Sequence, residues 1–122
     1  MSKPKTVKKY EAVSEARRRY APMPARKARL VLDLIRGKTV KQALAILQFT
    51  HKPSACPEVL NLVKSARANA EVGKAEDIDT LVITDAFADV AGMHKRLRPA
   101  PMGRGVRVRK RMCHITIRLN YV

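Results

Sequence analysis

The residues with the most evident chemistry are the cations between Lys95 and Arg111. The segment contains Lys95, Arg96, Arg98, Arg104, Arg107, Arg109, Lys110 and Arg111, and it contains no aspartate or glutamate. Arginine dominates this set, and its planar guanidinium matches phosphate oxygens with paired hydrogen bonds and stacks on nucleobases. The alternative is a solvated charge run that only keeps the chain soluble. Solubility requires neither an absence of acids nor interleaved prolines and glycines, so we interpret the segment as an RNA-binding arm.

The composition of the whole chain agrees with a polyanionic partner. Among 122 residues, lysine and arginine number 26 and aspartate and glutamate number 10, which gives a formal net charge of +16. A charge of this size repels itself in the compact state, so nucleic acid is the leading partner and an anionic membrane the second. No stretch approaches the roughly 20 apolar residues that span a bilayer. The basic N-terminus also lacks the apolar core of a secretory signal, so we expect a cytoplasmic protein without membrane contact.

Candidate catalytic and metal-binding groups are weak by comparison. Cys56 and Cys113 form no Cys-x-x-Cys pair, and we interpret them as reduced thiols that serve as small apolar residues. Cys113 and His114 are adjacent, but neighbours on a strand point to opposite faces and cannot form a nucleophile and base pair. Asp77 and Asp79 have no histidine at ligand spacing. We therefore expect no enzyme activity and no metal or cofactor.

Three helices are predicted over residues 24–37, 39–49 and 57–73. The expected start signals are Pro24, Thr39 as an N-cap, and Pro57, and the expected stop signals are Gly37 and Gly73. Each segment has an apolar stripe at helical spacing. The stripes are Ala28, Val31, Leu32 and Ile35; Val40, Ala43, Leu44 and Leu47; and Val59, Leu62, Val63, Ala66 and Ala70. We expect these stripes to form the core.

Two long strands are expected after the helices, at Leu81–Val90 and Val106–Val122, with glycine and proline between them. The second strand changes character along one face. That face consists of Cys113, Ile115, Ile117, Leu119 and Tyr121, and it continues backward as Arg111, Arg109 and Arg107. Because side chains alternate along a strand, the change from apolar to arginine predicts that the strand leaves the core near residue 112.

These elements predict an α+β fold with three helices packed on a small antiparallel sheet. The segment from Thr80 to Arg98 would span about 50–60 Å at about 3.3 Å per residue, whereas a body of this size is only about 30 Å across. We therefore expect the hairpin to project as a long arm over about residues 84–112. Residues 1–9 are interpreted as a basic flexible tail and residues 10–122 as a single domain, in which Tyr10–Tyr20 is either a strand or a loose extended segment.

Two further basic clusters are candidate RNA contacts. The first consists of Arg17, Arg18 and Arg19, and the second of Arg26, Lys27 and Arg29. The first cluster alternates between faces of an extended chain, so at least one of its side chains points away from the core. The second cluster lies at the start of a helix, where cations oppose the positive end of the helix dipole. That small cost indicates an outside partner, and a solvated face is the alternative.

Several blocks of this sequence resemble large-subunit ribosomal protein twenty-two in its bacterial form. The blocks are Ala28–Lys38, Ser65–Glu71, Lys95–Pro99, Gly103–Arg104, Lys110–Arg111 and His114–Ile117. Their order and separations are similar to those of the family from Tyr20 to Leu119. The N-terminal tail carries no resemblance.

The resemblance implies a structural protein of the large ribosomal subunit. In that family a body of three helices on a small sheet sits near the tunnel exit, and the hairpin threads through ribosomal RNA. The resemblance also implies a role in early subunit assembly, neighbouring ribosomal proteins and the nascent polypeptide as partners, and a monomer within the ribosome. By position, the RNA contacts would be Lys95, Arg96, Arg98, Arg104, Lys110 and Arg111, together with the basic residues of the first helix.

The resemblance also implies a tip, within Met93–Gly105, that lines the peptide exit tunnel. We expect the lining residues to be Pro99, Ala100, Pro101, Met102 and Gly103. Ala100 stands where the family commonly has a basic residue, and Pro101 and Met102 stand where small or basic residues are usual. The tip is therefore expected to be less charged and stiffer than is common in the family.

The competing class is a DNA-binding or nucleic-acid-chaperone protein with a basic β-arm. Arms of that kind usually accompany symmetric dimerisation, and the predicted helices leave no apolar stripe for a dimer once they pack. Co-sedimentation with large subunits in moderate salt separates the two classes. An enzyme, as a third class, would need a turnover that survives mutation of the arm.

The arm itself leads to a prediction about the free protein. An isolated two-stranded hairpin is marginally stable in water, so we expect the amides from Lys95 to Arg109 to exchange rapidly without RNA and slowly when RNA is bound. Hydrogen exchange measured by mass spectrometry checks this. Strong protection of the same amides in the RNA-free protein would contradict it.

Overall fold

The computed structural model describes residues 12–121. The basic tail predicted over residues 1–9 lies outside the described residues. The elements along the chain are β1 (Ser14–Ala21), α1 (Ala25–Ile35), α2 (Val40–Phe49), α3 (Cys56–Val72), a short 3-10 turn (Ile78–Thr80), β2 (Val82–Pro99), a second 3-10 turn (Pro101–Gly103) and β3 (Gly105–Asn120). The N-terminal segment is thus a strand from Ser14 onward rather than a loose extended segment.

The helix ends follow the predicted signals with two differences at the starts, one of which is that α3 begins at Cys56, one residue before Pro57. Pro24 is the N-cap of α1 in extended conformation, not its first helical residue. Gly37 follows α1 with a φ of 78°, a left-handed conformation that glycine adopts without steric cost. Thr39 caps α2 as predicted, because its hydroxyl accepts from the amide of Gln42 and the Gln42 side chain accepts from the amide of Thr39. Gly73 ends α3.

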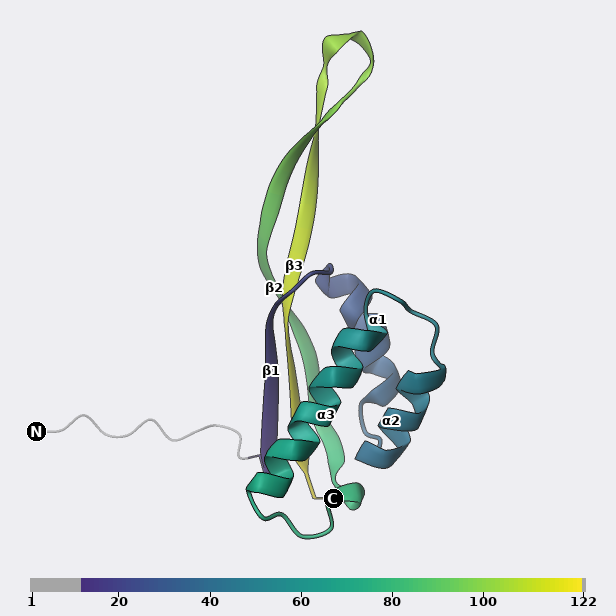
Figure 1. Ribbon diagram of the computed structural model, residues 1–122, viewed down its shortest axis with the longest axis vertical. Coiled ribbons are helices and arrows are strands. Elements are labelled where there is room, and N and C mark those ends of the chain that lie inside the picture. Colours follow the sequence, from purple (N-terminus) through teal and green to yellow (C-terminus); the bar gives the residue numbers. More distant parts are fainter. Residues whose placement is uncertain (1–11, 122) are drawn as a thin grey trace, which may run out of the picture.

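The three strands form an antiparallel sheet in the order β1-β3-β2, and the helices lie on one side of it (Figure 1). The predicted helix stripes are buried, except that Leu44 is only partly buried. Ile115, Ile117 and Leu119 of the central strand β3 have no exposed surface and meet the helices. The predicted α+β fold is therefore confirmed.

Tyr121 is a correction to the predicted core face of β3. It lies beyond the end of the strand, 46% of its surface is exposed, and its hydroxyl donates to the carbonyl of Glu76. The alternation that places Leu119 inside stops at Asn120, so the apolar face has four members rather than five.

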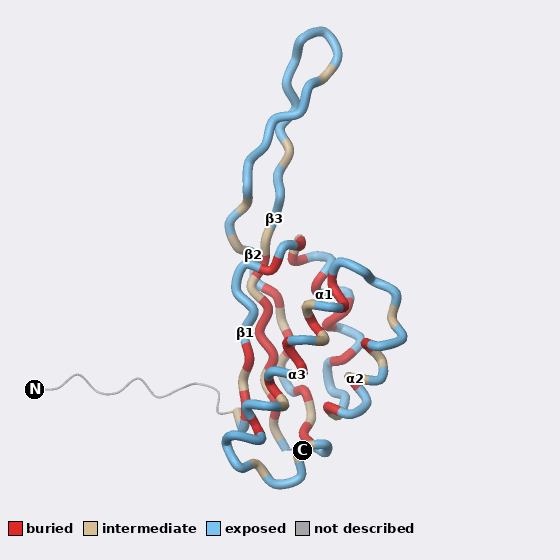
Figure 2. Tube along the Cα trace, viewed as in Figure 1, coloured by how far each residue is buried: buried red, intermediate tan, exposed pale blue. Residues whose placement is uncertain are grey.

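The arm is a longer and more regular hairpin than its glycines and prolines suggest. β2 does not stop at Val90 but pairs with β3 from Val82↔Asn120 to Pro99↔Gly105, interrupted by two register shifts. The segment Met93–Arg98, which the resemblance places within the tip, is paired strand, and the turn is confined to residues 100–104. Figure 1 shows the hairpin projecting beyond the body, as predicted, and Figure 2 shows that its surface is almost entirely exposed.

The contrast between core and arm generates a stability prediction. Leu32 has no exposed surface, so Leu32→Ala should lower the free energy of unfolding by about 2–5 kcal/mol through reduced burial and a residual cavity. Leu97 on the arm is 78% exposed, so Leu97→Ala should change the free energy of unfolding by no more than about 0.5 kcal/mol. Urea denaturation followed by circular dichroism checks both. Equal losses of stability in the two variants would contradict the assignment of core and arm.

Candidate nucleic-acid interface

The root of the arm coincides with the end of the buried face of β3. Cys113 has no exposed surface, whereas Arg111, two residues earlier on the same face, is exposed. On β2 the register shifts between Val90, opposite Cys113, and Met93, opposite Arg111, which places one extra residue on β2. Such a β-bulge bends and twists a strand. The change of environment predicted near residue 112 is therefore present, and a bulge marks it.

Cations occupy both faces of the arm. Lys95 lies opposite Arg109 on one face, and Arg111 lies on that face nearer the body. On the other face Arg96 lies opposite Val108, and Lys110 lies opposite His94. Because β-strand side chains alternate, no face of the arm is free of positive charge. The remaining predicted contacts lie further out, with Arg98 opposite Val106, Arg107 opposite Leu97, and Arg104 beside the turn.

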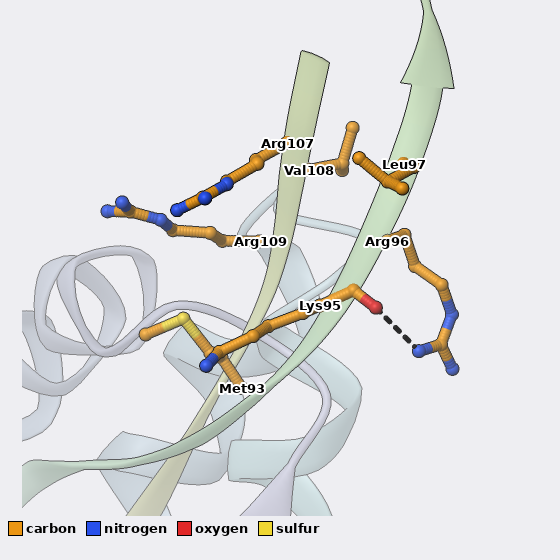
Figure 3. Close-up of a pocket in the computed structure, with 7 residues that line it drawn as sticks. All are labelled: Met93, Lys95, Arg96, Leu97, Arg107, Val108 and Arg109. Atoms are coloured by element: carbon orange, nitrogen blue, oxygen red, sulfur yellow. Dashed lines mark hydrogen bonds between the residues drawn. The ribbon is translucent and has the colours of Figure 1, made fainter. Parts of the chain in front are cut away.

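The arm has a groove that combines cations with apolar surface. It has a volume of about 850 Å³ and is lined by Met93, Lys95, Arg96, Leu97, Arg107, Val108 and Arg109. In Figure 3 the side chains of Arg107 and Arg109 extend side by side from β3, and Lys95 and Met93 extend toward the same side from β2. Arg96 turns to the other side, where its guanidinium donates to the carbonyl of Lys95. The groove offers phosphate donors beside surfaces on which a sugar or base can pack.

The charges of the arm are not neutralised within the fold. Within residues 12–121, none of the eight cations from Lys95 to Arg111 forms an ion pair. Six of the nine acids between residues 12 and 121 instead pair inside the body, as Asp85 does with Arg118 of the neighbouring strand at 3.7 Å. A hydrogen bond from Nε of Arg118 also holds the pKa of the Glu15 carboxyl below its usual value. In the part of the chain described here, the ion pairs therefore all lie in the body and none lies on the arm.

The tip is a short turn without formal charge between Pro99 and Gly103. Met102 adopts a φ of 65° and is 92% exposed. The amide of Ala100 donates to the carbonyl of Arg104 at 2.8 Å, which closes the turn. Left-handed conformations are unusual for residues other than glycine, asparagine and aspartate, so the backbone at Met102 is set by the closed turn. Because Met102 lies in this turn and is exposed, its side chain is presented at the far end of the arm.

The two other predicted clusters divide between outward and structural roles. Arg17 pairs with Glu15, and Arg18 turns toward the helices and donates to Glu58 at 2.9 Å. Arg19 is exposed and forms no ion pair among the described residues. The structure therefore leaves Arg19 facing outward and gives its two neighbours partners in the fold.

Arg29 has a structural contact that the sequence did not indicate. Both Nε and Nη2 of its guanidinium donate to the carbonyl of Ala88, at 3.1 and 2.9 Å, whereas Arg26 and Lys27 are simply exposed. Arg36 likewise donates to the carbonyl of Ala86. These two arginines cap the open edge of β2, where unpaired carbonyls would otherwise remain. Sequence reasoning missed them because nothing local signals a partner more than 45 residues away.

The candidate catalytic groups do not form a site. Cys113 is buried on the inner face of β3, and burial raises the pKa of its thiol, which disfavours the reactive thiolate. His114 lies on the opposite face, where its Nδ1 accepts from the amide of Tyr20 at 3.0 Å. Within residues 12–121, no group of three or more His, Cys, Asp or Glu residues is placed to hold a metal ion. No helix in that range is long and apolar enough to cross a membrane.

Comparison with known proteins decides the family. A family model described as Ribosomal protein L22p/L17e matches residues 16–120, which include the three helices and both strands of the arm. This chain belongs to the ribosomal protein L22p/L17e family. The family is one of ribosomal proteins and not a class of enzymes. The resemblance found in the sequence blocks is thereby confirmed.

Individual members of the L22p/L17e family match most of the chain. A large ribosomal subunit protein uL22 from Latilactobacillus sakei is 48% identical over 95 residues, which cover 78% of this chain and 80% of the relative. A protein of the same name from Desulfitobacterium hafniense is 46% identical over 99 residues, which cover 81% of this chain and 86% of the relative. The similarity therefore extends over most of the length of both relatives.

The capping role of Arg29 generates a prediction for this L22p/L17e protein. Arg29→Ala removes both hydrogen bonds to Ala88 and should lower the free energy of unfolding by about 1 kcal/mol. Arg26→Ala removes the same charge from an exposed position of α1 and should change it by less than about 0.5 kcal/mol. Chemical denaturation of both variants checks this, and indistinguishable stabilities would show that the contact of Arg29 contributes nothing to the fold.

Proposed function

We propose that this protein is a structural component of the large ribosomal subunit that binds large-subunit ribosomal RNA through its arm. In this proposal the arm helps the subunit to assemble, and its tip lines the tunnel through which the nascent peptide leaves. The observation that carries the proposal is the two-faced cationic arm, whose charges have no ion-pair partner in the described chain. The names of the relatives, large ribosomal subunit protein uL22, support the same assignment.

The two-faced charge favours RNA on both sides of the arm. An arm that lay on the surface of an RNA would need cations on one face only, and its other face would be neutral or acidic. Here Lys95, Arg107 and Arg109 point one way while Arg96 and Lys110 point the other. If folded RNA encloses the arm, the cations of both faces can bind phosphates, because phosphates can approach the arm from each side. Assembly is then assisted because one arm connects RNA segments that lie on its opposite faces.

The body suits a position at the surface of the subunit. All nine acids between residues 12 and 121 lie in the body and six of them pair with its arginines, so the attraction of the body for RNA is weaker than that of the arm. Neighbouring ribosomal proteins are the expected partners of its exposed faces, and the protein acts as a monomer within cytoplasmic ribosomes. The proposal requires no cofactor or membrane.

The uncharged tip is suited to the wall of a tunnel through which peptides of any sequence pass. Residues 99–103 carry no charge, whereas Arg98 and Arg104 flank them. The flanking cations would hold RNA, and the uncharged turn with the exposed side chain of Met102 would face the tunnel. A charged turn would retain peptides of opposite sign.

RNA binding by the arm should depend steeply on salt. If about six cations meet phosphates, the affinity for transcribed large-subunit ribosomal RNA should fall about a thousandfold or more between 50 and 200 mM salt. The double variant Arg107→Gln/Arg109→Gln should weaken binding and reduce the logarithmic salt slope by about one for each phosphate that the variant no longer binds. Filter binding across a salt series measures both quantities.

A matched control removes two exposed cations from the helices. Lys41→Gln/Lys64→Gln lowers the net charge equally, and it should leave the slope nearly unchanged because neither lysine lies on the arm. Equal effects of the two double variants would show that RNA binding depends on the net charge of the protein and not on the cations of the arm. Binding to duplex DNA as a dimer, with an affinity similar to that for RNA, would favour the competing DNA-binding class.

A further inference from the structure

We propose that the face of the sheet opposite the helices holds a second RNA site, a pocket for one unpaired base that bears an amino group. The pocket lies at the root of the arm and is built on Tyr20, His114 and Asp89. The proposal rests on the RNA-binding function proposed above. It adds a site that recognises base chemistry, whereas the cations of the arm recognise phosphates.

A bulge in β1 turns Tyr20 to this outer face. Ser14 and Ala16 are buried toward the helices, and alternation would send Tyr20 the same way. The register shifts between Arg18, opposite Ile115, and Ala21, opposite Cys113, so that Ala21 takes the buried position. Tyr20 is instead 58% exposed with a φ of 54°. A bulky side chain is strained in this left-handed conformation, and such strain is concentrated at functional sites.

The tyrosine ring is held in place by His114. The Tyr20 amide donates to Nδ1 of His114, and the two rings meet edge to face with their centroids 4.7 Å apart. Because Nδ1 accepts this hydrogen bond, the proton of the neutral imidazole sits on Nε2, which is then a donor. The outer face therefore presents an exposed aromatic surface beside a fixed donor.

Asp89 supplies an acceptor to the same pocket. It pairs with His114 across the β2 and β3 ladder and forms no ion pair among the described residues. The pocket has a volume of about 240 Å³ and is also lined by Arg17, Arg19 and Thr116. This volume is below the roughly 300–1,000 Å³ of pockets for drug-sized ligands, which suits a single planar ring. The carboxylate disfavours a phosphate inside the pocket, and Arg19 at its side, which forms no ion pair among the described residues, can meet a phosphate of the same nucleotide.

The combination of groups defines the class of base. Aromatic rings stack on any base, but a carboxylate accepts well from the amino group of cytosine, adenine or guanine. Uracil has no amino group, and its single ring N–H lies between two carbonyl oxygens that a carboxylate repels. The pocket lies where an RNA strand along the arm would arrive, because the Asp89↔His114 pair directly precedes the Val90↔Cys113 pair at the arm's root. On β3 the same face continues from His114 to Lys110 on the arm.

Tyr20→Gly separates the binding role of this residue from a structural one. Glycine adopts a φ of 54° without strain, so the variant should be as stable as the wild type or more so. Its affinity for a ten-nucleotide oligoadenylate should nevertheless fall by about fivefold or more through the loss of base stacking. Tyr20→Phe keeps the ring and should bind as the wild type does. The control Phe49→Ala removes an aromatic that is 88% exposed on α2 and should leave the affinity unchanged.

Asp89→Asn tests the choice of base. The wild type should bind oligoadenylate and oligocytidylate more tightly than oligouridylate, and Asp89→Asn should lose this preference because an amide also donates to the carbonyl of uracil. The base site would be overturned if Tyr20→Gly bound RNA as tightly as the wild type, or if this variant lost stability in parallel with RNA affinity. It would also be overturned if the wild type showed no preference among the three oligonucleotides. If Arg107→Gln/Arg109→Gln weakens RNA binding while Tyr20→Gly does not, only the base site fails. If neither variant weakens it, the proposed RNA-binding function fails as well.

Discussion

The burial of one face of β3 holds the body and the arm together. Cys113, Ile115, Ile117 and Leu119 have no exposed surface, and the strand that carries them is central, with β1 on one side and β2 on the other. An isolated hairpin of two strands is only marginally stable. The arm can therefore project because its two strands continue into a packed sheet whose register is set by that buried face. Every charge on the arm depends on this anchor for its position.

The second constraint is the separation of charge between body and arm. In the body, several arginines have acidic partners: Arg118 lies between Glu15 and Asp85 and over the ring of Phe87, and Arg67 lies near Glu71 and Asp79. Such exposed pairs contribute little individually to stability. Their effect is instead to reduce the positive field around the body. The arm, whose cations have no such partners among the described residues, is then the strongest site of attraction for a polyanion.

Among residues 12–121, the outer edges of the sheet meet side chains and, at the start of β2, the backbone of residues 37–40, rather than further strands. Arg29 and Arg36 of α1 donate to carbonyls of β2, and Asn69 of α3 donates to the carbonyl of Glu15 on β1. Open edges pair readily with other chains. The capping contacts therefore keep the three-stranded sheet from extending, and they fix α1 near the root of the arm. No helix or strand of residues 12–121 covers the sheet face opposite the helices, and this leaves room there for the pocket of Tyr20 and His114.

Sequence alone determined the helices, the buried face of β3 and the cationic arm, because burial imposes a period of 3.6 on helices and of 2 on strands. It also determined the family, since the blocks from Ala28 to Ile117 kept their order and spacing. It misjudged the arm's outer half, where Gly92 lies at a bulge within paired strand and does not begin the tip. Only the tertiary structure decided that Arg29 caps Ala88 and that Tyr20 faces outward. Both outcomes depend on contacts with residues more than 50 positions away, and local periodicity carries no information about such partners.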